Sequence, residues 1–168
     1  QGLVVGGKIA DPDKLADELR KIRDECDIDF VHVALPEEQA YVFQTVLESP
    51  PSSRKELKIV IESKLEENVP IPSGEATFDY EVIHKDASGN YIVNVVVYPH
   101  AVASDYVYTL RSAGFVPTVF EVEAQAIARA VLPRDHKTYM LVDFGGSRSG
   151  IAIVSEGTLR FTSTIEVG

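Results

Sequence analysis

The sequence predicts a fold of mixed α and β structure (α/β, of the α+β type), and three observations predict it. Apolar residues recur at helical spacing in four segments, and apolar runs of strand length lie between those segments. Turn residues, mostly glycine and proline, separate the segments from one another. The chain has 168 residues, of which 45% are hydrophobic and 25% are charged, which is the composition of a globular protein.

The first predicted helix begins at Asp11, an acidic N-cap that is followed by a proline at the first helical position. Leu15, Leu19, Ile22 and Cys26 then fall on one apolar face. We therefore expect Cys26, the single cysteine of the chain, to be buried in that face. One cysteine cannot form an internal disulfide, which fits a reducing compartment.

A second helix is predicted over Arg54–Asn68, after a short linker at residues 50–53. Ile59 points roughly away from the inward face of this helix, where it is either an ordinary exposed residue or a contact. The inward face is predicted to carry four apolar side chains, namely Leu57, Val60, Ile61 and Leu65.

The middle of the chain, residues 41–120, is predicted as strand, helix, strand, strand, helix, strand. A hairpin turn at residues 86–90 joins two of the strands, and Gly114 is placed to cap the second helix in the left-handed conformation. A strand at Phe30–Leu35 precedes this module. The other expected segments are strands at 41–48, 77–85, 91–98 and 115–121, helices at 102–113 and 124–131, and three strands within 138–168.

The turn after Asp143 carries the clearest chemical signal. A hydrophobic strand ends at Asp143, and Gly145, Gly146 and Ser147 follow before the next strand. A carboxylate beside exposed backbone N–H groups can hold a metal-bound phosphate, because the amides bind phosphate oxygens and the carboxylate holds the cation or its water. The same residues also suit an ordinary tight hairpin turn, so the pattern alone leaves both interpretations open.

Composition excludes several classes of partner. The formal net charge of −10 disfavours nucleic acid, because the protein would face the phosphate backbone with like charge, and it disfavours direct docking to anionic lipid. The longest apolar run, residues 91–98, is far too short to span a bilayer, and no signal peptide is visible. The four histidines lack metal-ligand spacing. Gln1 is not a native start residue, so we expect a fragment.

Short motifs along nearly the whole chain carry a resemblance to a known family. They are 9–15 (IADPDKL), 32–36 (HVALP), 56–57 (EL), 61–62 (IE), 69–72 (VPIP), 79–82 (DYEV), 110–115 (LRSAGF), 120–124 (FEVEA), 128–129 (AR), 141–145 (LVDFG) and 157–161 (GTLRF). Each motif is weak alone, but their order and spacing are specific. Together they resemble the PilM family of pilus-assembly proteins, which are cytoplasmic, actin-like components of the type IV pilus inner-membrane platform and are related to the cell-division protein FtsA.

The resemblance implies a partial actin-like ATPase fold that is interrupted by a small inserted subdomain, called 1C, of strand-helix-strand-strand arrangement. It assigns residues 1–50 and 119–137 to the first actin-like lobe and residues 51–118 to the insert. Residues 138–168 would then form the opening strands of the second lobe.

The resemblance also makes the turn after Asp143 the second phosphate-binding loop. Asp143, Gly145, Gly146 and Ser147 would contact ATP and Mg²⁺ in the intact parent protein. The family's first phosphate loop does not appear before Gly2, and the adenosine-binding part is missing. Each lost charged hydrogen bond removes about 1.5–3 kcal/mol, and about 1.4 kcal/mol is tenfold in affinity. We therefore expect no catalytic residue, no metal and no measurable ATP binding for this chain alone.

A peptide partner is a further implication. In the PilM family, a short N-terminal cytoplasmic segment of the membrane protein PilN binds a groove between the first lobe and the insert. This chain resembles both walls, so we expect a PilN-like peptide and, with it, pilus motor and platform proteins as partners at the cytoplasmic face of the inner membrane. Candidate wall residues are Ile59, Tyr106 and Tyr108, although core packing would explain each of them equally well.

Self-association is expected through residues 138–168. Their three strands belong to a sheet whose other strands are absent, and exposed strand edges invite pairing with another chain. We therefore expect a homodimer through this segment. The apolar residues that need a cover are Leu141, Ile151, Ile153, Leu159, Phe161 and Ile165.

Three other classes remain open on the sequence. They are an FtsA-like cell-division protein, a type II secretion platform protein, and an ATP-dependent enzyme of the actin and sugar-kinase superfold. The enzyme would require a catalytic carboxylate or an additional substrate domain, and neither is evident. The leading hypothesis is therefore a structural adaptor, a nucleotide-responsive scaffold that connects the pilus platform to its cytoplasmic motors.

Overall fold

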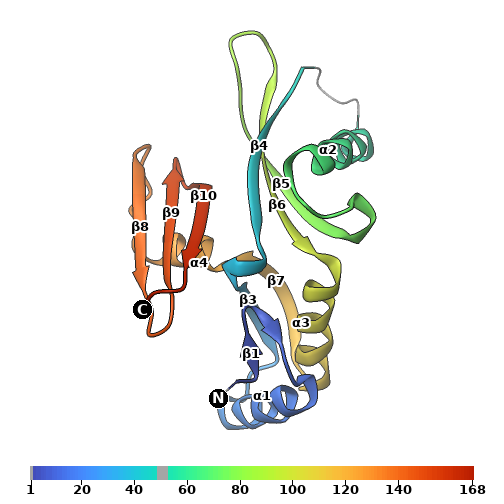
Figure 1. Ribbon diagram of the computed structural model, residues 1–168, viewed down its shortest axis with the longest axis vertical. Coiled ribbons are helices and arrows are strands. Elements are labelled where there is room, and N and C mark those ends of the chain that lie inside the picture. The colour runs from blue at the N-terminus through green and yellow to red at the C-terminus, as the bar shows by residue number, and fades with distance from the viewer. Residues whose placement is uncertain (1, 49–52) are drawn as a thin grey trace.

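Four small sheets and their helices are arranged along an elongated molecule in the computed structural model, which describes residues 2–48 and 53–168 (Figure 1). A three-stranded sheet with one helix lies at the top of the view, a parallel strand pair with two helices lies below it, and a second three-stranded sheet lies to the left. Most of the predicted linker at residues 50–53 falls outside the described residues.

The lower part contains α1 (Pro12–Cys26), β3 (Phe30–Leu35), α3 (His100–Ser112) and β7 (Val116–Val122), with a short hairpin of β1 (Val4–Val5) and β2 (Lys8–Ile9). β3 and β7 pair in parallel although about eighty residues separate them in sequence, because the whole insert lies between them in the chain. The two helices pack through a small core of Ala16, Leu110, Ala113 and Phe115.

The start of α1 confirms the predicted cap, but the prediction for Cys26 is wrong. The Asp11 carboxylate accepts a hydrogen bond from the Lys14 amide at 3.1 Å. Cys26 is exposed, and Ile22 is 48% exposed. Helical spacing predicts which residues share a face, but it does not predict how long the partner element is. In the last turns of α1 the Arg23 side chain, and not Ile22 or Cys26, lies against the neighbouring structure at Gly114.

The upper part of the molecule, for which we keep the name insert, contains β4 (Tyr41–Leu47), α2 (Arg54–Asn68), β5 (Ala76–Lys85) and β6 (Tyr91–Pro99). Its antiparallel sheet has the order β4-β6-β5. Two short 3-10 helices, η1 (Glu37–Gln39) and η2 (Ser73–Glu75), precede β4 and β5. α2 covers one face of the sheet. Its Ile61 and Leu65 are fully buried as predicted, whereas Val60 is 36% exposed, because the sheet covers a narrower stripe of the helix than the apolar pattern suggests.

The strand pairing joins elements that the predicted domain division separates. β4 pairs with β6 along its whole length, so it belongs to the insert's sheet, although the division at residue 50 puts it in the first lobe. α3 packs on α1 of the first lobe, although the division puts it in the insert.

The chain then continues through α4 (Glu123–Val131), β8 (Thr138–Phe144), β9 (Ser149–Ser155) and β10 (Thr158–Ile165). The three strands form the predicted antiparallel meander, in the order β10-β9-β8. Its inner face packs on α4 and on the ends of β3, β6 and β7, and this is the core that joins the three parts of the molecule. Its buried members are Leu35, Tyr98, Val122, Ala124, Ala128, Ala152, Val154 and Leu159.

Candidate functional site

The loop between β8 and β9 is a tight turn. The Gly145 amide donates a hydrogen bond to the Arg148 carbonyl at 2.9 Å. A Cβ on Gly145 would lie 2.8 Å from that same oxygen, so the turn itself requires glycine there. A Cβ on Gly146 would meet nothing within 4 Å. The structure therefore brings Asp143, Gly145, Gly146 and Ser147 together in one exposed loop, and it explains one of the two glycines by the turn alone.

The residues at 167 and 168 lie on this loop. Ser149, which is buried, donates a hydrogen bond from Oγ to the Val167 carbonyl at 2.6 Å. An added Cβ on Gly168 would be 2.5 Å from the Ser147 amide nitrogen. The backbone of the loop that would face a phosphate is therefore in contact with residue 168.

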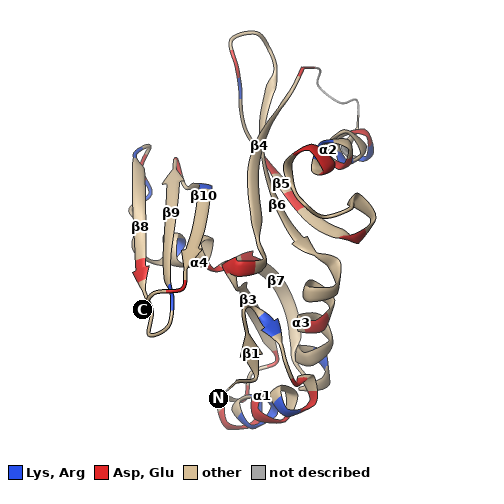
Figure 2. Cartoon of the chain, in the orientation of Figure 1, with Lys and Arg blue, Asp and Glu red and all other residues tan. Residues whose placement is uncertain are grey.

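Arg148 connects this loop to the first lobe. Its guanidinium donates to Glu38 of η1 and, at 2.6 Å, to Glu123 at the start of α4. Beside it, the Thr162 hydroxyl of β10 donates to Glu37 at 2.6 Å. Figure 2 shows η1 as an acidic segment near the centre of the molecule. Arg148 was not among the predicted site residues, although a basic residue in an acidic chain, directly after the candidate phosphate loop, was a usable signal.

The surroundings of Glu123 raise the pKa of its carboxyl. Burial raises its pKa above the ordinary value of 4.5, and the charges of Glu37, Glu38 and Asp143 raise it further. Arg148 opposes this shift but does not cancel it. The Glu123 carboxyl is therefore harder to ionise than an exposed one, mainly because it is partly buried.

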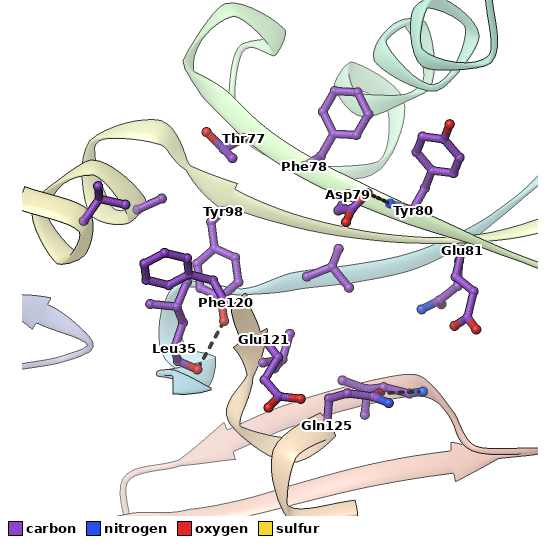
Figure 3. Close-up of a pocket in the computed structure, with 16 residues that line it drawn as sticks. Leu35, Thr77, Phe78, Asp79, Tyr80, Glu81, Tyr98, Phe120, Glu121 and Gln125 are labelled. Carbon is purple, nitrogen blue, oxygen red and sulfur yellow. Dashed lines mark hydrogen bonds between the residues drawn. The ribbon is translucent and has the colours of Figure 1, made fainter. Parts of the chain in front are cut away.

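A cleft of about 520 Å³ lies between the insert, the first lobe and β10 (Figure 3). Residues of β5 and β6 line its insert side, and residues of β3, β7, α3 and α4 line the rest. Most of its lining is apolar, for example Val96, Phe120 and Leu159. Its size and composition are those of a typical ligand-binding site.

Internal hydrogen bonds hold the walls of the cleft in place. The Tyr98 hydroxyl donates to the Leu35 carbonyl at 3.3 Å, and burial raises the pKa of this hydroxyl well above its usual range. Gln125 of α4 donates to the Gly157 carbonyl and accepts from the Leu159 amide, both at 3.2 Å. These bonds fasten α4 to the turn between β9 and β10 on this side of the cleft.

The cleft borders the unpaired edge of β5. All five residues from Thr77 to Glu81 line it, although successive side chains of a strand point to opposite faces. Figure 3 shows Phe78 and Tyr80 pointing toward α2, so these two border the cleft along the edge of the strand. No strand of the described part of the chain pairs with this edge.

The three predicted partner-binding residues lie outside this cleft. Ile59 is 56% exposed on α2, and Tyr108 is 58% exposed on α3 beside His100. Tyr106 is half-buried, and its hydroxyl donates to the Gly7 carbonyl at 3.2 Å. Burial raises the pKa of Tyr106 to about 12. The structure does not bring the three together, and their role in partner binding remains a prediction.

Within the described residues no helix is long and apolar enough to cross a membrane, and no group of three His, Cys, Asp or Glu side chains is placed to hold a metal ion.

The fold is that of an actin-like protein. A solved structure described as the "PilM-PilN type IV pilus biogenesis complex" matches with a TM-score of 0.81 at 19% identity, over 98% of this chain and 51% of that one. The cytoplasmic domain of EpsL, an inner-membrane component of the type II secretion system of Vibrio cholerae, matches with a TM-score of 0.63 at 17% identity, over 90% of this chain and 56% of that one. The ethanolamine utilization protein EutJ from Carboxydothermus hydrogenoformans matches with a TM-score of 0.53 at 15% identity, over 100% of this chain and 41% of that one.

Among actin-like proteins, the family of this chain is also identified. A model of the family described as "Type IV pilus assembly protein PilM" matches residues 1–168, so the chain belongs to that family. The predicted family and the predicted actin-like fold are both confirmed. The chain spans about half the length of the PilM structure that it matches. None of the curated protein sequences compared with the chain matches it.

Proposed function

We propose that this chain is the part of an actin-like pilus scaffold that binds a short N-terminal peptide of a PilN-like membrane protein. It works as an adaptor and not as an enzyme. It acts in the cytoplasm at the inner face of the membrane, where the bound peptide links it to the platform and motor proteins of the type IV pilus. The cleft beside β5 carries this proposal.

The geometry of the cleft suits an extended peptide. The unpaired edge of β5 runs along the cleft from Thr77 to Glu81, so a peptide can add to the sheet as a fourth strand once the Tyr80 amide exchanges its bond to Asp79 Oδ1 for one to the peptide. The apolar walls at Val96, Phe120 and Leu159 then take alternate side chains of the peptide. Main-chain bonds supply affinity in this mode, and the side-chain pockets supply specificity.

A direct experiment is a fluorescence-anisotropy titration of a labelled PilN-like N-terminal peptide with this chain. We expect saturable binding that excess unlabelled peptide reverses. Absence of saturation up to the solubility limit would contradict the proposal.

Nucleotide binding belongs, in this proposal, to the longer parent protein. Asp143, Gly146 and Ser147 are exposed and Arg148 lies beside them, but residue 168 lies on the Ser147 amide and must move aside before the loop can hold a phosphate with its cation. The Gly145 amide is already used within the turn. We expect calorimetric titration of Mg-ATP into this chain to give no heat of binding, because one loop supplies only a fraction of the contacts that a nucleotide needs.

Self-association through residues 138–168 is also proposed. Two of the residues expected to need a cover do not, because Leu159 is buried in the core and Leu141 packs against it. The outer face of the β8–β10 sheet is apolar, and the register aligns Met140, Ile153 and Phe161 across its three strands. Met140 is 66% and Phe144 is 83% exposed. Exposed apolar faces of this kind favour association. A monomeric mass by light scattering at high concentration would contradict it.

A further inference from the structure

One buried polar atom inside the cleft lacks a partner. Asn94 interrupts the apolar sequence of β6, is only 5% exposed, and lines the cleft. Its Oδ1 is fully covered and accepts no hydrogen bond from any described residue. Buried amide oxygens are nearly always hydrogen-bonded, so this atom points to a donor that comes from outside the chain.

Two carboxylates stand next to this atom. In the sheet register Glu81 of β5 lies directly opposite Asn94, and Asp79 follows two residues away on the same face. Directly opposed residues have Cβ atoms about 4.5–5.5 Å apart, so the Glu81 and Asn94 side chains are neighbours. Figure 2 shows acidic positions along this part of β5.

Both carboxylates belong to exposed residues, and neither has a counter-charge within the cleft. Glu81 accepts a hydrogen bond from the Thr158 hydroxyl at 3.3 Å, and Asp79 accepts one from the Tyr80 amide at 2.9 Å. Neither forms an ion pair within residues 2–48 and 53–168, and no described Lys, Arg or His lines the cleft. Glu121 also lines it, but that carboxylate is already paired with Arg129.

Apolar side chains line the cleft beside Asn94 and Glu81. Val96 and Phe120 line the same cleft, and Val96 is the residue of β6 that lies on the same face as Asn94, two positions away. A ligand group that fits must therefore combine an apolar stem with a head that donates hydrogen bonds and carries positive charge. Lysine and arginine side chains have this form, since their methylene stems pack on apolar surface while the charged head stays with polar partners.

We propose that the cleft binds a basic side chain of the partner peptide, with its stem on Val96 and Phe120 and its head on Glu81 and on Asn94 Oδ1, which turns from its covered position toward the ligand on binding. This inference rests on the proposed function, because it names the chemistry of the peptide that the same cleft takes. It makes Asn94 and Glu81 determinants of which peptide is accepted.

A matrix of peptides and variants tests the proposal. The PilN-like peptide is compared with versions in which each Lys or Arg in turn is replaced by Met, against the unmodified chain, Asn94→Leu and Glu81→Gln. Glu75→Gln, an exposed acid of the insert outside the cleft, is the matched control. We expect one Met peptide to bind the unmodified chain about tenfold to a hundredfold more weakly, as the loss of a charged hydrogen bond predicts. Against Glu81→Gln and Asn94→Leu that difference should shrink to a few-fold.

The outcomes separate this inference from the proposed function. If the unmodified PilN-like peptide binds saturably but no Lys or Arg replacement weakens its binding, the inference is wrong and the proposed function stands. If the parent peptide does not bind, the proposed function fails. A second measurement then decides the inference. Titration with N-acetyl-arginine methylamide should shift the side-chain amide resonances of Asn94 by NMR, whereas the norleucine analogue should not. Equal responses to the two compounds would overturn it.

Discussion

The cleft beside β5 and the loop after Asp143 are both candidate binding sites, and the structure treats them differently. In the cleft, one buried acceptor, Asn94 Oδ1, lacks a partner, and the carboxylates of Asp79 and Glu81 lack a cation within the described residues. In the loop, the Gly145 amide is bonded within the turn, and Arg148 is held by two carboxylates.

This difference indicates which of the two sites offers polar groups to a ligand. Polar groups that stay unpaired in a preformed apolar site are favourable places for a ligand, because binding supplies the missing hydrogen bonds. Polar groups that already pair with the protein must first release those partners, which costs affinity. The cleft therefore offers polar groups to a ligand, whereas the loop after Asp143 is held to Glu38 and Glu123 by Arg148.

The largest expected effect comes from filling the cleft. Ala103 of α3 lines it and is half-buried, so Ala103→Trp should place an indole where the peptide lies. We expect peptide affinity to fall about thirtyfold or more, which corresponds to losing a hot-spot contact of about 2 kcal/mol. Anisotropy titration measures it. Ala101→Trp, an exposed position on the same helix, is the control and should bind within about twofold of the unmodified chain.

Removing Arg148 should affect stability and leave peptide binding unchanged. Arg148→Met deprives Glu38 and Glu123 of their cation, so we expect the free energy of unfolding to fall by about 1.5–3 kcal/mol in urea titrations. Arg134→Met, at an exposed position without an ion pair in the described residues, should have little effect. If Arg148→Met lowers the affinity for the peptide as strongly as it lowers stability, the cleft and the loop are not independent of each other.

The two glycines of the loop after Asp143 should differ in how much a substitution by alanine lowers stability. Gly145→Ala places a Cβ 2.8 Å from the Arg148 carbonyl, and both atoms belong to the backbone framework, so the turn must open. We expect a loss of about 1–3 kcal/mol in the free energy of unfolding. Gly146→Ala meets open space and should change it by less than about 0.5 kcal/mol. Equal effects would show that the turn is not held as described.

The smallest expected effect is a pH dependence that arises at Glu123. Its pKa is raised in the folded protein, so this carboxyl contributes stability that is fully present below its unfolded pKa of about 4.5 and is lost as pH rises through the folded value. Glu123→Gln cannot titrate, so this part of the pH dependence should disappear from its urea midpoints. Parallel pH profiles for the two proteins would contradict the assignment.

Much of the fold follows from local sequence patterns. The cap at Asp11, the hairpin turn between β5 and β6 and the meander of β8–β10 were predicted because turn residues and apolar spacing fix them locally. Cys26 and Val60 were predicted as buried and are not, since spacing defines a helix face but not the extent of the element that covers it.

The candidate sites show the same limit. The loop at Asp143 is contiguous in sequence, so a motif was enough to find it. The cleft combines β3, β5, β6, β7 and α4, which meet only because β3 pairs with β7 across the insert. Asn94 was visible as a polar residue in an apolar strand, but only its burial without a partner marks it as a binding atom.

Amide NMR mapping would locate the bound peptide on the surface of the chain. The unlabelled PilN-like peptide is titrated into the isotopically labelled chain, and shift changes are read along the backbone. The account predicts the largest changes at Thr77 to Glu81 on β5 and at Tyr98, Ala103 and Phe120. Changes confined to the exposed surface around Ile59 and Tyr108, or to the loop at Asp143, would contradict it.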